Sequence, residues 1–348
     1  MTEQRRGGQA GDPAVTQANL ASPPADSVPL AEDPATLLTQ ASRGERAALA
    51  RLLSMVERGG AAAGAVAALS YATEIPYTVG LTGAPGAGKS TLTDALIGQA
   101  LAGWPAPVDE PVPRLGVLAV DPSSPFSGGA MLGDRVRMSR HATDGRVFIR
   151  SMATRGHLGG LSLAVPGAVR VFGAAGFGAV LIETVGVGQM EVEIASAADT
   201  TVVVVTPGWG DSMQAHKAGL LEVADVFVVN KADRGGVDET RRDLKSMLAH
   251  STPTGWRPEV VETTATTGQG LDLLWGAVAR HRDHVVRAGV LAGRRADRLA
   301  TELRRVLVTR FEQRIDELTS GRAFASALEA MAAGEIDPSE AAARLLAL

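Results

Sequence analysis

Short apolar runs that alternate with amphipathic stretches fill the middle of the chain. The runs are rich in β-branched residues and lie at Tyr77–Thr82, Leu115–Val120, Val147–Ile149, Ala179–Glu183, Thr200–Thr206, Val226–Asn230 and Val260–Thr263. Strands that alternate with helical stretches are typical of a mainly parallel sheet covered by helices on both faces. We therefore predict an α/β domain over residues 76–285, and we expect no strand after about Val286.

Helical periodicity predicts an extension before this domain. Asp33-Pro34 combines a capping residue with a first-turn proline, and apolar positions from Leu37 to Val56 recur at roughly helical spacing up to Gly59-Gly60. We predict a helical segment at 33–75, with a second helix over Ala61–Tyr71. Residues 1–32 are rich in Pro, Ala, Ser and Gly and lack the apolar core of a signal peptide, so we expect a disordered tail.

A second helical extension is expected at residues 286–348. It contains a second Asp-Pro helix start at Asp337-Pro338 and an apolar stripe on a charged background, formed by Leu299, Leu303, Val306, Phe311 and Ile315. An amphipathic helix must bury its apolar face. We expect this arm to form a homodimer, and the alternative is that it packs back onto the N-terminal helices.

Composition narrows the classes of function. The chain has 348 residues, with 34 Lys+Arg against 38 Asp+Glu and a net charge of −4, which argues against a nucleic-acid-binding surface. The absence of Cys excludes disulfides and Cys-ligated metal sites and fits the reducing cytoplasm, where we expect the protein to work. No apolar run approaches the ~20 residues that span a bilayer, so we expect no membrane partner.

A phosphate-binding loop follows the first predicted strand. Its residues are Gly83-Ala84-Pro85-Gly86-Ala87-Gly88-Lys89-Ser90, and Thr91 continues into a helical run. In the GxxxxGK[ST] pattern, glycines let backbone N–H groups surround the β-phosphate, Lys89 reaches the β/γ oxygens and the Ser90 hydroxyl ligates Mg²⁺. The alternative is a glycine-rich turn with an exposed lysine, but the strand-then-helix context favours nucleotide binding.

Base recognition is predicted at Asn230-Lys231-Ala232-Asp233, at the end of another predicted strand. A carboxylate at Asp233 can accept from the two adjacent donors of guanine, which adenine lacks. Asn230 can tie neighbouring loops together while the Lys231 stem covers the purine. Alone, the pattern also fits a solvated turn. The segment Thr264-Ala265-Thr266 follows the last strand, and its backbone N–H groups are placed to meet the guanine carbonyl.

Three carboxylates between these motifs are candidates for the metal site together with Ser90. Asp121 and Glu183 end predicted strands, and Asp134 lies in a Gly-Asp-Arg segment. Carboxylates opposite a phosphate loop can hold Mg²⁺ directly or through water. For each, a helix cap or a surface ion pair is the alternative. The backbone N–H of Gly186 is a candidate γ-phosphate sensor.

These motifs together resemble the methylmalonyl-CoA-mutase-associated GTPases, the MeaB or ArgK type, also labelled LAO/AO transport kinases. The matching strings are GLTGAPGAGKST (80–91), VDPSSPFSGGAMLGDRVRM (120–138), FIRSMATRGHLGG (148–160), ETVGVGQ (183–189) and NKAD (230–233). The resemblance implies a P-loop fold, Mg²⁺ near Ser90, Asp121, Asp134 and Glu183, a homodimer, and service to an adenosylcobalamin-dependent acyl-CoA mutase. Trp209, Ser212 and His216 depart from the pattern, which leaves the partner's identity open.

The partner expectation also has a basis in the residues. The loop strings 121–138, 148–160 and 207–217 are longer than nucleotide contact requires. Their basic side chains are suited to recognising a protein surface or to lending a cation to the γ-phosphate, and they are Arg135, Arg137, Arg150, Arg155 and Lys217. Two other functions stay open at this point. One is GTP-driven nickel or cobalt insertion, which usually needs Cys- or His-rich segments. The other is an ATP-dependent kinase linked to amino-acid transport, against which Asp233 argues.

Overall fold

Seven parallel strands form one sheet in the order β3-β2-β4-β1-β5-β6-β7. They are β1 (Tyr77–Gly83), β2 (Arg114–Asp121), β3 (Val147–Ala153), β4 (Phe177–Thr184), β5 (Thr200–Val205), β6 (Val226–Asn230) and β7 (Glu259–Thr263). The computed structural model describes residues 33–103, 114–121, 139–141, 143–153, 164–184, 197–208, 222–250 and 255–347. Every predicted strand is present, so the α/β prediction is confirmed. The predicted tail at 1–32 lies outside the described residues.

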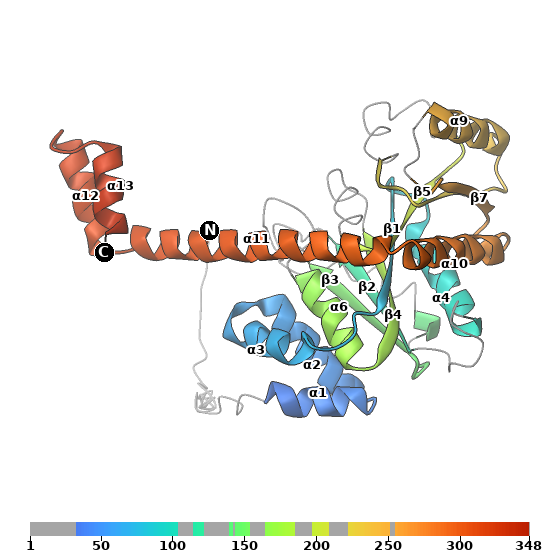
Figure 1. The fold of residues 1–348 in the computed structure, drawn as a ribbon, viewed down its shortest axis with the longest axis horizontal. Coiled ribbons are helices and arrows are strands. Elements are labelled where there is room, and N and C mark those ends of the chain that lie inside the picture. Colours follow the sequence, from blue (N-terminus) through green and yellow to red (C-terminus); the bar gives the residue numbers. More distant parts are fainter. Residues whose placement is uncertain are drawn as a thin grey trace, which may run out of the picture. The chain divides into compact units, whose positions relative to one another are not determined.

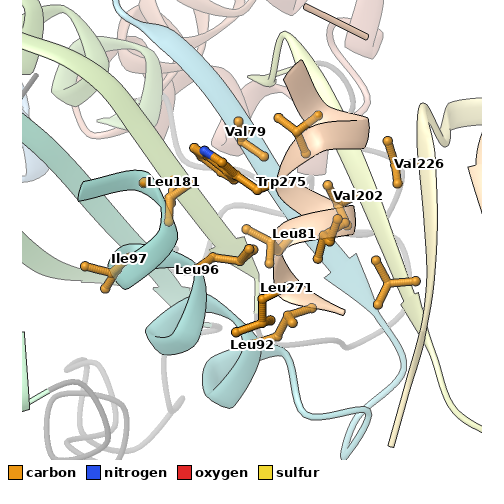
Figure 2. Close-up of a cluster of buried hydrophobic side chains, with 14 of the residues drawn as sticks. Val79, Leu81, Leu92, Leu96, Ile97, Leu181, Val202, Val226, Leu271 and Trp275 are labelled. Atoms are coloured by element: carbon orange, nitrogen blue, oxygen red, sulfur yellow. The ribbon is translucent and has the colours of Figure 1, made fainter. Parts of the chain in front are cut away.

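One face of the sheet is covered by α4 (Lys89–Ala102) and α10 (Leu271–Arg287) (Figure 1). Alternate residues of the central strands point to this face, among them Val79, Leu81 and Val202, and they meet Leu92, Leu96 and Trp275 from the two helices (Figure 2). The other set of alternate residues is buried as well, because helices also cover the opposite face. Strands buried on both faces explain the uninterrupted apolar runs in the sequence.

The opposite face is covered by α6 (Ala164–Ala174), the N-terminal helices and α9 (Val237–His250). The N-terminal helices are α1 (Pro34–Ser42), α2 (Arg46–Arg58) and α3 (Gly60–Ser70). The prediction of one helix from Pro34 to Gly59 was wrong, because this segment forms two helices, α1 and α2. Gly44 explains the break, because its φ of 99° is left-handed and cannot continue a helix.

The C-terminal region is helical, as predicted, with α11 (Val290–Thr319), α12 (Arg322–Ala332) and α13 (Pro338–Leu346). The Asp337 side chain caps α13 by accepting from the Glu340 backbone N–H at 2.9 Å. No residue of α11 is buried, and the side chains of Leu303 and Phe311 are 61% and 69% exposed. The stripe therefore does not pack back onto the N-terminal helices. Within the described ranges no helix is long and apolar enough to cross a bilayer.

Ion pairs between arginines of α11 and two buried carboxylates attach this helix to the starts of β5 and β6. The Asp199 carboxylate, 1% exposed, accepts from Arg295 Nη2 at 2.7 Å, from Arg298, and from the Thr78 backbone N–H at 3.0 Å. The Asp225 carboxylate oxygen Oδ1 lies 3.2 Å from Nη1 of Arg294. Burial alone would raise the pKa of Asp199, but the hydrogen bonds and charges of the two arginines outweigh it and hold the pKa below its usual value. The arm is thus fastened by charge at the amino-terminal edge of the sheet.

Removing this charge is expected to destabilise the protein. Asp199→Asn should lower the free energy of unfolding by about 3–5 kcal/mol at pH 7, because it leaves two guanidinium groups without their buried partner. Folding lowers the pKa of Asp199, so this carboxylate stabilises the folded protein fully above its unfolded pKa of about 3.9. That stabilisation is lost as the pH falls through the pKa of the folded state. Denaturant titrations at pH 7, 5 and 3.5 measure this. The control, Glu317→Gln in the exposed pair with Arg314, should change little at any pH; equal losses in both variants would contradict the assignment.

Candidate functional site

The parallel sheet brings the predicted site residues to one edge. Because every strand runs in the same direction, the carboxyl ends of β2, β4, β1 and β6 lie along that edge, with β5 between β1 and β6. They carry Asp121, Glu183, Gly83 and Asn230. Registered pairing sets Glu183 beside Leu81 of β1 and Ala119 of β2. Ligands of open parallel sheets bind at this edge.

The loop between β1 and α4 requires its glycines. Gly83 has a φ of 136°, and a Cβ there would lie 2.1 Å from the Val204 carbonyl oxygen. Gly86 and Gly88 also have left-handed φ values, of 75° and 89°. The helix α4 begins directly after Gly88, so its unpaired backbone N–H groups and its partial positive charge face the loop. The loop is therefore an anion-binding cradle.

Lys89 adds a buried cation to this cradle. Its side chain is buried, and its Nζ donates to the carbonyl oxygens of Gly83 at 2.7 Å and Ala84 at 3.0 Å. Both acceptors belong to the loop itself, so the ammonium is positioned at the loop before any phosphate arrives. Phosphate oxygens carry more negative charge than carbonyl oxygens and are the stronger acceptors for this group.

Ser90 and Glu183 form the oxygen-donor part of the site. The Ser90 hydroxyl donates to Glu183 Oε1 at 2.5 Å, and the Glu183 side chain is 1% exposed. A hydroxyl and a carboxylate oxygen are the donors that Mg²⁺ prefers, and this ion keeps several of its waters. The donor set therefore fits the metal predicted from the sequence. Asp121 ends β2 at the same edge, but its side chain, like Asp134, lies outside the described residues.

Asn230 links three segments of the site. Its Nδ2 donates to the Ala87 carbonyl oxygen at 2.8 Å, across 143 residues of sequence. Its Oδ1 accepts from Thr263 Oγ1 at 3.2 Å and from the Ala265 backbone N–H at 3.3 Å. These hydrogen bonds are the link between neighbouring loops that the sequence predicted for Asn230. Thr263 was missed by the sequence reasoning, although a hydroxyl residue at the end of the last strand is a usable signal.

The neighbouring residues belong to the predicted base-recognition region. Lys231, with a φ of 60°, donates from Nζ to the Gly86 carbonyl oxygen at 2.6 Å, so its stem lies across from the phosphate loop. The 264–266 turn is closed by a hydrogen bond of 3.0 Å from the Thr264 backbone N–H to the Gln269 carbonyl oxygen. Asp233 is exposed beyond β6. Its carboxylate is accessible to a ligand.

Other predicted positions fall on parts of the chain that are not described. These are Gly186 and the basic residues Arg135, Arg137, Arg155 and Lys217, together with Trp209, Ser212 and His216. Arg150 lies in the described part of the chain, and its predicted role in partner recognition is not supported. Its Nη2 donates to Glu57 Oε2 at 2.5 Å and to Ser54 Oγ at 3.1 Å, so it attaches α2 to β3. A half-buried, paired guanidinium is a poor choice for partner recognition.

Fold and site together define a P-loop nucleotide-binding protein with an Asn-Lys-x-Asp segment for the base. Residues 49–320 match the family model described as "Methylmalonyl Co-A mutase-associated GTPase MeaB". The chain belongs to this family of P-loop GTPases, which confirms the resemblance seen in the motifs.

Individual relatives agree with the family assignment. A protein of Pyrococcus abyssi named as a GTPase is 43% identical over 315 residues, which cover 89% of this chain and 95% of the relative. The GTPase ArgK of Escherichia coli is 36% identical, with 72% of this chain and 76% of the relative covered. A crystal structure titled as a LAO/AO transport system kinase matches with a TM-score of 0.65 and 25% identity, over 92% of this chain and 98% of that one.

A matched pair of glycines tests the contact between the phosphate loop and Asn230. Gly88→Ala should destabilise the nucleotide-free protein more than Gly86→Ala, because a Cβ at Gly88 would lie 2.6 Å from Asn230 Nδ2 whereas at Gly86 it meets nothing within 4 Å. Both positions have left-handed φ, so the backbone strain of about 1–2 kcal/mol is shared. Thermal unfolding of the two variants measures the difference. Equal midpoints would show that the loop is not packed against Asn230.

Proposed function

We propose that the protein hydrolyses GTP to GDP and phosphate with Mg²⁺ bound at Ser90 and Glu183, and that this cycle gates cofactor delivery to, and protection of, an adenosylcobalamin-dependent acyl-CoA mutase. Methylmalonyl-CoA mutase is the proposed partner. The observation that supports the nucleotide part is the set of hydrogen bonds by which Asn230 links the phosphate loop at Ala87 to the turn at Ala265.

The residues of this site have distinct tasks. The cradle of residues 83–91 binds the phosphates, and Lys89 neutralises the charge shared by the β- and γ-phosphates as the bond to the leaving GDP lengthens. Asn230, Lys231 and the 264–266 turn orient the base, and Asp233 accepts from its N1–H and 2-amino groups. Phosphoryl transfer depends mainly on such positioning and electrostatics, so this set accounts for both binding and turnover.

Ser90 and Glu183 are the described residues that would hold the metal. When bound, Mg²⁺ supplies positive charge to the β- and γ-phosphate oxygens. Asp121 and Asp134 are proposed as further carboxylates around it, and the Gly186 backbone N–H as the group that senses the γ-phosphate. The Ser90 hydroxyl, which donates to Glu183, keeps lone pairs that would be available to the ion.

The partner proposal is supported by the family name, which associates these GTPases with methylmalonyl-CoA mutase. A GTPase transmits its nucleotide state through segments that change with the γ-phosphate. The segments 121–138 and 207–217 are proposed to be read by the mutase, with Lys217 as a contact. A homodimer through α11 is part of the same proposal, because exposed apolar side chains on this helix need a cover.

Nucleotide preference should follow the Asp233 carboxylate. GTP and GDP should bind much more tightly than ATP, since the unmatched donors and acceptors of the wrong base cost several kcal/mol. Asp233→Asn should weaken GTP binding about 100-fold or more and shift the preference to xanthosine triphosphate, whose position 2 is an acceptor. Calorimetric titration measures this, with Asp243→Asn on the exposed face of α9 as the control. Equal affinities for GTP and ATP would contradict the assignment.

Turnover should depend on Lys89 and respond to the partner. Lys89→Ala should lower GTP hydrolysis at saturating GTP by roughly 100-fold or more, because it removes a cation that stabilises the transition state. Adding purified methylmalonyl-CoA mutase from the same organism should accelerate the wild type, and Lys217→Ala should reduce that acceleration more than it weakens GTP binding. Phosphate release is the readout. Unchanged turnover over a full mutase titration would remove this partner and leave the GTPase in place.

The oligomeric state should depend on the apolar face of α11. Light scattering should give a dimer for the wild type and a monomer for Phe311→Glu combined with Leu303→Glu, because two buried charges oppose association. The matched control is Leu273→Glu on α10, where the leucine is 62% exposed, close to the 61% of Leu303. A monomeric wild type at micromolar concentration, or a dimer that survives the double substitution, would refute this interface.

A further inference from the structure

A cavity lies away from the phosphate loop, between α6 and α11. It has a volume of about 80 Å³ and borders on Thr78 and Asp199, at the starts of β1 and β5. Because the strands are parallel, this is the amino-terminal edge of the sheet, whereas the nucleotide site is at the carboxyl edge. The two sites therefore do not share a residue.

The cavity combines apolar walls with a cationic rim. Its apolar lining is formed by Ile75, Val165, Pro166, Val169, Ala197 and Leu299. Four arginines and two carboxylates also line it, namely Arg170, Arg295, Arg298, Arg305, Asp199 and Glu302. The lining thus carries a formal charge of 4 − 2 = +2.

Three of the four arginines already bind a carboxylate of the lining, two of them sharing Asp199. Arg170 makes two hydrogen bonds to Glu302, of 2.7 Å and 2.6 Å, and Arg295 and Arg298 bind Asp199. Arg305 makes no ion pair or hydrogen bond with the described part of the chain, although it is partly buried at the rim. Its guanidinium group is a fork of donors suited to a carboxylate. Among the described residues, Arg305 is thus the arginine of this lining that has no partner, and it lies next to an apolar space.

We propose that this cavity binds a small organic carboxylate, with its aliphatic part against Val165, Val169 and Leu299 and its carboxylate on Arg305. The size follows from the volume. At about 10–15 Å³ for each water-sized group, 80 Å³ accommodates about six non-hydrogen atoms. Such a ligand contacts both α6 and α11, so its binding strengthens the attachment of the arm to the GTPase domain. This inference does not rest on the proposed function.

Butyrate, with four carbons and two oxygens, is the probe. Titration of the full-length protein with sodium butyrate at constant ionic strength, followed by calorimetry and by hydrogen exchange, should show saturable binding with a dissociation constant on the order of millimolar. Amides in α6 and in residues 294–305 should exchange more slowly with butyrate present. Butanol should bind at least about tenfold more weakly, because it lacks the charge that Arg305 recognises.

Two variants locate the binding. Arg305→Ala should weaken butyrate binding roughly tenfold or more, and Leu299→Trp should abolish it by filling the cavity from its rim. Arg304→Ala, an exposed neighbour that does not line the cavity, is the matched control and should bind as the wild type does. Circular dichroism and GTP binding verify that each variant is folded.

Three results would overturn the proposal. The first is absence of saturable binding up to 50-fold above the expected millimolar range. The second is equal affinity for butyrate and butanol, which would remove the role of the cation. The third is unchanged butyrate affinity in either Arg305→Ala or Leu299→Trp, which would place the binding elsewhere.

Discussion

The side-chain amide of Asn230 makes the contacts on which the geometry of the nucleotide site depends. It donates to the phosphate loop at Ala87 and accepts from Thr263 and Ala265, so one planar group with fixed donor and acceptor ends joins the ends of β1, β6 and β7. A buried amide whose donor and acceptor are both used resists displacement, since each broken bond leaves an unsatisfied group. The phosphate-loop motif is thereby positioned relative to the segment proposed to read the base.

The two edges of the sheet use charge in different ways. At the carboxyl edge, Lys89 is held by carbonyl oxygens, which a more negative ligand can replace. At the amino edge, Asp199 and Asp225 are paired with arginines of α11, and these full charges compensate each other without a ligand. The first arrangement is suited to exchange and the second to permanent attachment. A rigid sheet, buried on both faces, separates them.

Much of the fold and of the nucleotide site could be predicted because the signals are local. Strands buried on both faces read as continuous apolar runs, and the GxxxxGK[ST] spacing encodes a turn whose left-handed positions only glycine adopts readily. The Asp337 cap was predicted for the same reason, since cap and helix lie within one turn of sequence. Periodicity was less reliable where one residue decided the outcome, as at Gly44, which divides the expected N-terminal helix.

Residue types and spacing along the chain thus predicted the α/β class, the phosphate-loop and guanine-type motifs, and the apolar stripe of residues 299–315. Only the tertiary structure decided which of the many charged residues are paired. Asp199 and Asp225 look like ordinary loop aspartates in the sequence, and Arg150 looks like a free surface cation, because the partner of each lies tens of residues away. Burial and compensation of a charge are set by packing between distant segments, a property that no local pattern contains.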